Sequence, residues 1–174
     1  MAGLNISKVK FLVVEDNPFM KDLLRQILRT LGVTQIVEAG NGAEGYELFT
    51  QMSPDIVLLD WQMEPMDGLE LTKMIRAKES PNQYVPIIMI TAFSEIARVT
   101  LARDGGVNEI LVKPIAATNL FSRIRAVIER PRLFVEAETY FGPDRRRRAD
   151  PNYNGEDRRV AAKRDLAFVG NSAA

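Results

Sequence analysis

Short apolar runs alternate with stretches of helical periodicity along residues 8–130. The runs are rich in β-branched residues and predict five strands, at Lys8–Val14, Gln35–Ala39, Ile56–Asp60, Ile87–Thr91 and Glu109–Val112. Helices are predicted between them, from Asn17-Pro18 to Gly32, from about Ala43 to Met52, after Asp67-Gly68, from near Ser94, and over about Ala117–Arg130. The fourth helix has the weakest apolar stripe, so we expect it to be the least firmly packed. This alternation predicts a parallel sheet covered on both faces.

Polar residues stand where several of these runs end. They are the acidic pair Glu15-Asp16, Asp60, Thr91 and the Lys113-Pro114 step. Because the carboxyl ends of parallel strands meet at one edge of a sheet, where open α/β sheets bind ligands, we expect these side chains to gather there. Three crowded carboxylates favour protonation unless a cation compensates, so the cluster itself implies an ion. The set can hold a divalent cation and a phosphoryl group, with Asp60 as acceptor.

Composition narrows the chemistry further. The chain is 46% hydrophobic and 26% charged with zero net charge, so no whole-molecule field attracts nucleic acid or membrane. It has no cysteine and no histidine, which excludes disulfides, thiolate sites and imidazole catalysis within it. A histidine-borne phosphoryl group must therefore come from another protein. The N-terminus does not resemble a signal peptide and no segment suits a membrane span, so we expect a cytoplasmic protein with no membrane partner.

The composition changes at Pro131, which divides the chain into residues 1–130 and an Arg-rich extension over residues 131–174. The extension lacks sustained periodicity and is rich in Arg, Pro, Gly and Asn. We therefore predict that it is largely irregular and that it lies against a partner.

Four motifs carry a resemblance to a known family. They are Phe11-Leu12-Val13-Val14-Glu15-Asp16-Asn17, Asp60-Trp61-Gln62-Met63-Glu64-Pro65-Met66-Asp67-Gly68, Thr91-Ala92 and Lys113-Pro114. In this order and at strand ends, they resemble the receiver domain of two-component response regulators, most closely CheY-like proteins, over about residues 8–130. The resemblance implies a flavodoxin-like (βα)5 α/β fold with strand order 2-1-3-4-5. It also implies a stand-alone response regulator in a phosphorelay that acts as a phosphoacceptor and not as an enzyme in the usual sense.

The resemblance implies a role for each site residue. Asp60 accepts the phosphoryl group from a histidine kinase or a histidine phosphotransfer protein, and Thr91 and Lys113 assist as catalytic residues. Magnesium, with Mn²⁺ as a possible substitute, is held by Asp16, Asp60 and the backbone carbonyl of Gln62, and Glu15 acts through a bound water. The output is expected to be contact with a downstream protein that the sequence does not identify.

Two positions depart from the family pattern. Glu64 occupies the place where receivers usually have proline, which adds an acid near the site. Ile110 occupies the switch position, where receivers usually have Tyr or Phe, so readout of phosphorylation through the fourth helix, fifth strand and fifth helix is in question. A homodimer through that same face is one arrangement that the resemblance leaves open.

Tyr140 and Phe141, followed by Arg145, Arg146, Arg147 and Arg148, suggest a docking segment in the extension, because aromatic anchors beside arginines are common at interfaces. The arginines alone would also be compatible with a nucleic-acid contact. Flanking acids and the lack of a DNA-binding motif argue against DNA as a partner.

Other functions remain as alternatives. A degenerate receiver would act as a phosphate-independent interaction module, and a regulator could bind nucleic acid through the extension. A haloacid-dehalogenase-type phosphatase is disfavoured, since that family needs a second Asp where Gln62 stands. A flavodoxin-type cofactor binder is disfavoured because Glu15-Asp16 would repel FMN phosphate.

Overall fold

Five parallel strands form the central sheet, in the order β2-β1-β3-β4-β5. They are β1 (Lys10–Val14), β2 (Gln35–Ala39), β3 (Ile56–Asp60), β4 (Ile87–Thr91) and β5 (Glu109–Val112). The structure, a computed structural model, describes residues 4–144 and 159–160. Residues of β3 and β4 are buried throughout, as expected of central strands covered on both faces. The strand order is the predicted flavodoxin-like one.

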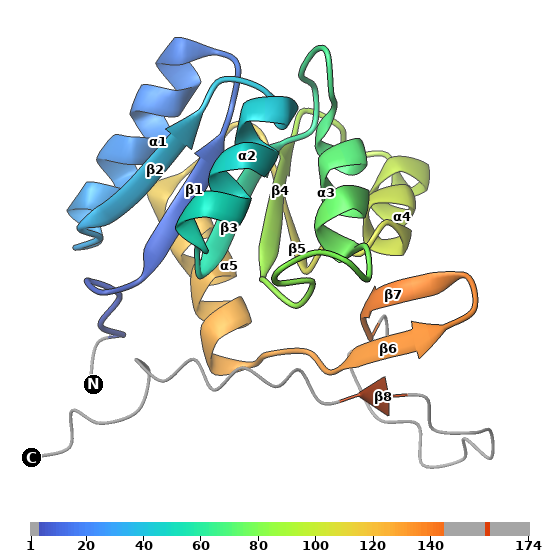
Figure 1. Cartoon of the computed structure of the whole chain (residues 1–174). Helices are drawn as coiled ribbons and strands as arrows, with labels where there is room; N and C mark the ends of the chain where they lie inside the picture. Colours follow the sequence, from blue (N-terminus) through green and yellow to red (C-terminus); the bar gives the residue numbers. More distant parts are fainter. Residues whose placement is uncertain (1–3, 145–158, 161–174) are drawn as a thin grey trace, which may run out of the picture.

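Five helices cover the two faces of this sheet (Figure 1). Helices α1 (Pro18–Thr30) and α5 (Ala117–Glu129) share one apolar cluster with the sheet. Helices α2 (Gly42–Met52), α3 (Gly68–Arg76) and α4 (Ile96–Asp104) share the second cluster on the opposite face. Within residues 4–144 and 159–160, no helix has both the length and the apolarity to cross a bilayer.

Local sequence signals account for most element boundaries. The side chain of Asn17 accepts hydrogen bonds from the backbone N–H groups of Phe19 and Met20, which fixes the start of α1. Asp67 and Glu70 form a capping box at the start of α3. The first strand begins two residues later than predicted, because the N–H of Val9 bonds to the carbonyl of Ile6 in a turn.

Helix α4 is the least firmly packed, as predicted. It begins at Ile96, slightly beyond the expected start, and its N-cap residue Glu95 makes no side-chain capping bond. Ala102 is its one buried residue. Little apolar area is therefore removed from water when α4 docks.

The described part of the extension forms strands, which the sequence analysis did not predict. A hairpin of β6 (Phe134–Ala137) and β7 (Tyr140–Pro143) is joined by β8 (Arg159–Val160) into an antiparallel sheet with the order β7-β6-β8. The strands are short, and the interrupting Glu138-Thr139 turn hides their alternation from a periodicity search.

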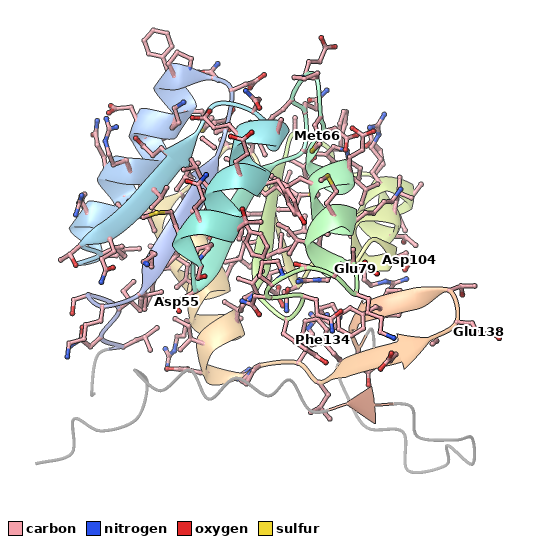
Figure 2. All side chains as sticks on the ribbon, in the orientation of Figure 1. Asp55, Met66, Glu79, Asp104, Phe134 and Glu138 are labelled. Atoms are coloured by element: carbon pink, nitrogen blue, oxygen red, sulfur yellow. The ribbon has the colours of Figure 1, made fainter. Side chains whose placement is uncertain are left out.

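An aromatic cluster holds the hairpin on the receiver fold. The ring of Phe134 is 2% exposed and lies 5.1 Å from the ring of Tyr84 and 5.4 Å from that of Phe141, measured between centroids. The guanidinium carbon of Arg76 lies 5.2 Å from the centroid of Phe134. Figure 2 shows Phe134 and Met66 at opposite ends of the sheet, so the hairpin lies at the end away from the loop after β3.

Polar and backbone contacts reinforce this attachment. Arg132 pairs with the buried carboxylate of Glu109 at 2.9 Å. A Cβ atom on Gly142 would lie 2.9 Å from the Cα of Gly106, in the loop that follows α4. The hairpin therefore contacts the receiver at the start of β5 and at the end of α4.

Gly68 closes the loop that follows β3. Its N–H bonds to the carbonyl of Trp61 at 2.9 Å. A Cβ atom at this position would lie 2.3 Å from the carbonyl oxygen of Asp60, which is backbone and cannot rotate away. The two ends of this loop, at Asp60 and at Gly68, can therefore approach each other this closely only because residue 68 has no side chain.

Replacing Gly68 with Ala should lower the free energy of unfolding by about 2 kcal/mol, because the added methyl group overpacks this backbone contact. Urea denaturation of both proteins measures the difference. Gly40→Ala is the control, since its Cβ would meet its nearest neighbour at 3.4 Å, an ordinary contact. Equal stability of Gly68→Ala and the wild type would contradict the close approach.

Replacing Phe134 with Ala should cost about 3 kcal/mol, because a buried ring is removed from an aromatic cluster. Leu133→Ala is a matched control, as its side chain is 45% exposed one residue away. Thermal unfolding of the wild type and both variants measures how much stability each substitution removes. If both lose the same small amount, the hairpin does not contribute to the stability of the fold.

Candidate functional site

The predicted site residues converge at the carboxyl edge of the sheet. Glu15 and Asp16 follow β1, Asp60 and Thr91 end β3 and β4, and Lys113 follows β5. The Nζ atom of Lys113 lies 2.7 Å from Asp60 Oδ1 and 3.4 Å from Glu15 Oε2. Carboxylate oxygens of Glu15, Asp16 and Asp60 all lie within 4.8 Å of one another. Parallel strand register brings together residues that are nearly 100 positions apart, as the separation of 98 between Glu15 and Lys113 shows.

Two of the three carboxylates are buried. Glu15 is 1% exposed and Asp60 is 4% exposed, whereas Asp16 faces solvent. Burial raises the pKa of Asp60, and the hydrogen bond from Lys113 offsets part of that effect. Burial also raises the pKa of Glu15, with the negative charge of Asp60 as a second cause. The site therefore concentrates negative charge where water screens it poorly.

Lys113 is the amine that faces this charge. Burial lowers its pKa, but the hydrogen bond and charge of Asp60, together with those of Glu15, outweigh burial, so its pKa is raised. It is therefore a cation at neutral pH. Its side chain is one-quarter exposed, so it is less buried than the two carboxylates that it contacts.

Backbone groups orient the remaining polar side chains. The N–H of Phe93 donates to the Thr91 hydroxyl at 3.0 Å, so the buried hydroxyl keeps its own proton for another acceptor. The N–H of Gln62 donates to the carboxylate of Asp60, and Asn17 N–H donates to Glu15 Oε1 at 3.2 Å. These bonds fix the direction of both buried carboxylates.

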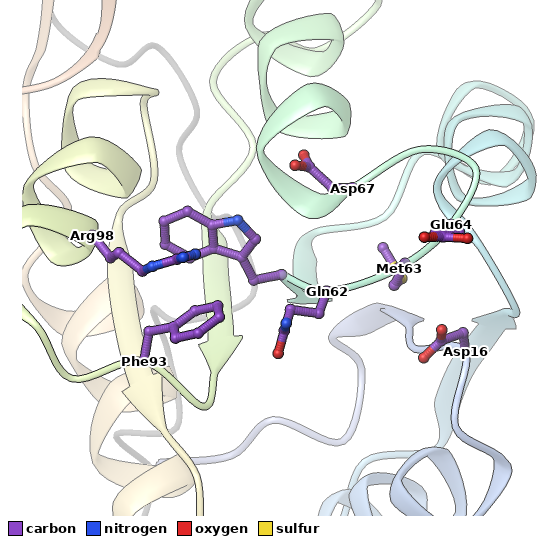
Figure 3. A pocket seen from close by; sticks show the side chains of 8 residues that line it. Asp16, Gln62, Met63, Glu64, Asp67, Phe93 and Arg98 are labelled. Carbon is purple, nitrogen blue, oxygen red and sulfur yellow. The ribbon is translucent and has the colours of Figure 1, made fainter.

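A pocket opens beside these groups (Figure 3). Its lining residues come from the loop after β1, the loop after β3, and the segment from Phe93 into α4: Asp16, Trp61, Gln62, Met63, Glu64, Asp67, Phe93 and Arg98. Glu64, which departs from the family pattern, is thus an additional acid near the site, as expected. Ile110, the predicted switch residue, is half-buried and packs on the cluster that includes β3 and β4.

The sequence did not single out Trp61 or Arg98. Trp61 directly follows Asp60, and that adjacency was the available signal. Arg98 is brought to the pocket by the loop between β4 and α4, and neither periodicity nor spacing reveals its contact with Phe93.

Two of the proposed docking residues, Tyr140 and Phe141, begin β7 and do not line this pocket. Phe141 contacts Tyr84 and Phe134 within its own chain, and the hydroxyl of Tyr140 donates to the carbonyl of Pro143. Residues 145–148 lie outside the described part of the chain. A role of these residues in docking a partner stays a prediction.

The family model for the response regulator receiver domain matches residues 11–125. Chemotaxis protein CheY-3 of Vibrio cholerae is 34% identical over 130 residues, which span 75% of this chain and 99% of CheY-3. A CheY homolog of Campylobacter jejuni is 37% identical over 121 residues, 69% of this chain and 92% of the relative.

Solved structures show the same architecture. CheY in a complex with CheX, BeF3 and Mg from Borrelia burgdorferi aligns with a TM-score of 0.64 and 27% identity, covering 72% of this chain and 95% of that one. The receiver domain of a sensor histidine kinase from Pseudomonas aeruginosa, with a magnesium ion in its active site cleft, aligns with a TM-score of 0.61 and 28% identity, covering 67% and 94%. Together with the converging carboxylates and lysine, these matches show that the chain belongs to the CheY-like receiver domains of two-component response regulators.

Proposed function

We propose that this chain accepts a phosphoryl group on Asp60 from a partner phosphohistidine and transmits the signal by protein contact. The contact between Lys113 Nζ and Asp60 Oδ1, at 2.7 Å, is the observation that carries the proposal. It places an amine beside the acceptor oxygen, where the negative charge of the transferred group would develop. A histidine kinase or a histidine phosphotransfer protein is the expected donor, since the chain itself has no histidine. A cytoplasmic location is part of the same proposal.

The carboxylate cluster suits a magnesium ion. Magnesium prefers oxygen ligands and takes one or two carboxylates together with water and phosphate oxygens. Asp16 and Asp60 would bind it directly, Glu15 through water, and the Gln62 carbonyl would supply a further oxygen. When bound, the ion neutralises charge on the phosphoryl oxygens. Mn²⁺ should substitute, because it accepts the same ligand type.

The residues of the chain have separate tasks in the transfer. A carboxylate oxygen of Asp60 forms the new bond to phosphorus while the bond from phosphorus to the donor nitrogen breaks and its electron pair leaves with the imidazole. The Lys113 ammonium offsets charge on the phosphoryl oxygens, and the Thr91 hydroxyl donates to one of them. Hydrolysis of the acyl phosphate later returns Asp60, so the chain is a self-catalysing acceptor and not a turnover enzyme.

Exposed apolar side chains support an output through protein contact. Ile96 on α4 is 84% exposed, Leu101 on α4 is 51% exposed, and Val112 at the end of β5 is 37% exposed. Since α4 is weakly packed, a small change at the site can alter the position of these side chains. Ile110 replaces the usual aromatic switch residue, so movement of α4 would have to carry the signal.

Incubation with magnesium and acetyl phosphate should add the mass of one phosphoryl group to the wild type, because Asp60 and Lys113 are already in contact. Asp60→Asn should gain none, and Thr91→Ala should react about tenfold more slowly or worse, since one hydrogen-bond donor to the transferred group is lost. Intact-mass spectrometry over time gives both results.

Asp55→Asn is the matched control for this experiment. Asp55 directly precedes β3 at the end of the sheet opposite the site, whereas Asp60 ends it. Its variant should react like the wild type. No mass increase in the wild type with several donors would favour the alternative of a degenerate receiver that acts without phosphate.

Stability should also depend on pH through the buried acids. Since the pKa of Asp60 is raised above its ordinary value of 3.8, the folded state binds this proton more tightly than the unfolded chain. The contribution of Asp60 to stability is therefore fully present below that value and is lost as the pH rises through its higher pKa in the folded state. In the presence of a chelator that removes magnesium, the wild type should lose stability relative to Asp60→Asn as the pH rises above about 4.

Urea denaturation along this pH series measures the difference, and Glu138→Gln, exposed on the hairpin, controls for the loss of an acid elsewhere. Magnesium at neutral pH should restore stability to the wild type more than to Asp60→Asn. A pH-independent difference between wild type and Asp60→Asn would show that burial does not perturb Asp60.

A further inference from the structure

Among the residues that the structure describes, one cation lines the pocket beside Asp60. Of its eight lining residues, Asp16, Glu64 and Asp67 are acids and Arg98 carries the positive charge. Two of the lining residues shown in Figure 3 contact the acceptor: Asp16 shares the carboxylate cluster with Asp60, and the backbone N–H of Gln62 donates to the Asp60 carboxylate, so the pocket borders Asp60. The transfer described above gives Arg98 no task.

Arg98 is held by stacking. Its guanidinium carbon lies 3.7 Å from the ring centroid of Phe93. That ring in turn meets the indole of Trp61 edge to face, with centroids 6.1 Å apart and an interplanar angle of 85°. Trp61 is 6% exposed and belongs to the buried core, so its contact restricts the movement of the Phe93 ring on which Arg98 stacks. The guanidinium is thereby positioned although Arg98 is an exposed residue.

Stacking leaves the guanidinium able to bind an anion. A guanidinium contacts an aromatic ring through its flat face, while its N–H groups point outward in the plane and can bind phosphoryl oxygens. Lys113 already contacts both Asp60 and Glu15. The side chain of Asp67 accepts the backbone N–H of Glu70 in the capping box of α3. Arg98 is thus the pocket residue placed to receive negative charge.

An incoming phosphoryl donor is an anion that must pass Asp16, Glu64 and Asp67. Like charges at these positions disfavour its approach, and a positive group that lines the same pocket offsets that repulsion. We propose that Arg98 is a specificity residue that binds the phosphoryl oxygens of the donor before transfer. It makes and breaks no covalent bond, and the phosphoryl group moves to Asp60 as described above. This inference rests on the proposed function of Asp60.

The test compares second-order rates of phosphorylation by acetyl phosphate, with magnesium, using intact-mass time courses. Arg98→Gln keeps a polar side chain without the charge and should slow the reaction about threefold to tenfold, the range expected for loss of a charge at the rim of a binding site. Arg98→Lys should fall between Arg98→Gln and the wild type, since it keeps the charge but not the flat stack. Added salt should slow the wild type more than Arg98→Gln.

Arg103→Ala is the matched control. Arg103 is also an exposed arginine of α4, but it pairs with Asp104 at 3.3 Å, away from the pocket. Its variant should react at the wild-type rate. Phosphoramidate provides a second comparison, because it carries less net negative charge than acetyl phosphate near neutral pH and should be less sensitive to Arg98→Gln.

Magnesium affinity provides a second measurement, because Arg98→Gln should slow phosphorylation without weakening the binding of magnesium. Trp61 is the only tryptophan and lines the pocket, so its fluorescence can follow a magnesium titration. Loss of the positive charge should leave magnesium binding unchanged or slightly tighter, whereas general damage to the pocket would weaken it. If Arg98→Gln reacts as fast as the wild type, or loses magnesium affinity and reaction rate together, the role assigned to Arg98 is wrong, while the proposed function of Asp60 still stands. A wild type that takes no phosphoryl group overturns both this inference and the proposed function.

Discussion

Burial of Glu15 and Asp60 against the ammonium of Lys113 is the interaction on which the rest of the site depends. Two acids with raised pKa values are unfavourable in a folded protein unless a cation faces them. Lys113 meets this need in part, and its place at the end of β5 is set by two strand pairings, β3 with β4 and β4 with β5. The register of the strands therefore determines the pairing of charges at the site as well as the burial of apolar side chains. A slip of one residue would bury Lys113 or expose Asp60.

The fold could be predicted from the sequence because its local signals agree with one another. Four strands begin and end where the apolar runs do, and the caps at Asn17 and Asp67 mark two helix starts. The candidate site was equally accessible, since each of its residues stands at the end of a run and the parallel topology brings such ends together. The matching family model confirms the fold and the family, whereas the roles of individual residues remain predictions.

The remaining features depend on contacts between distant segments. The hairpin is formed by two four-residue strands, too short for a period to be recognised, and it is held by Tyr84 and Arg76 far earlier in the chain. The stack of Arg98 on Phe93 likewise follows from the path of one loop. Helix α4 lies between these two features, with the stack near its first turn and the Gly106–Gly142 approach just after its last. Its few core contacts are thus supplemented at both ends.

The attachment of the hairpin also determines which segment of the chain can be moved into another protein as a stable receiver domain. A chimera that joins this receiver to another protein immediately after α5 would remove Phe134 from the ring of Tyr84, and it would remove one of the two arginines that pair with Glu109, keeping Arg123 but not Arg132. A junction after Asp144, whose backbone N–H bonds to the carbonyl of Leu133, keeps the hairpin closed. For recombination, the working boundary of this receiver therefore lies beyond its last helix.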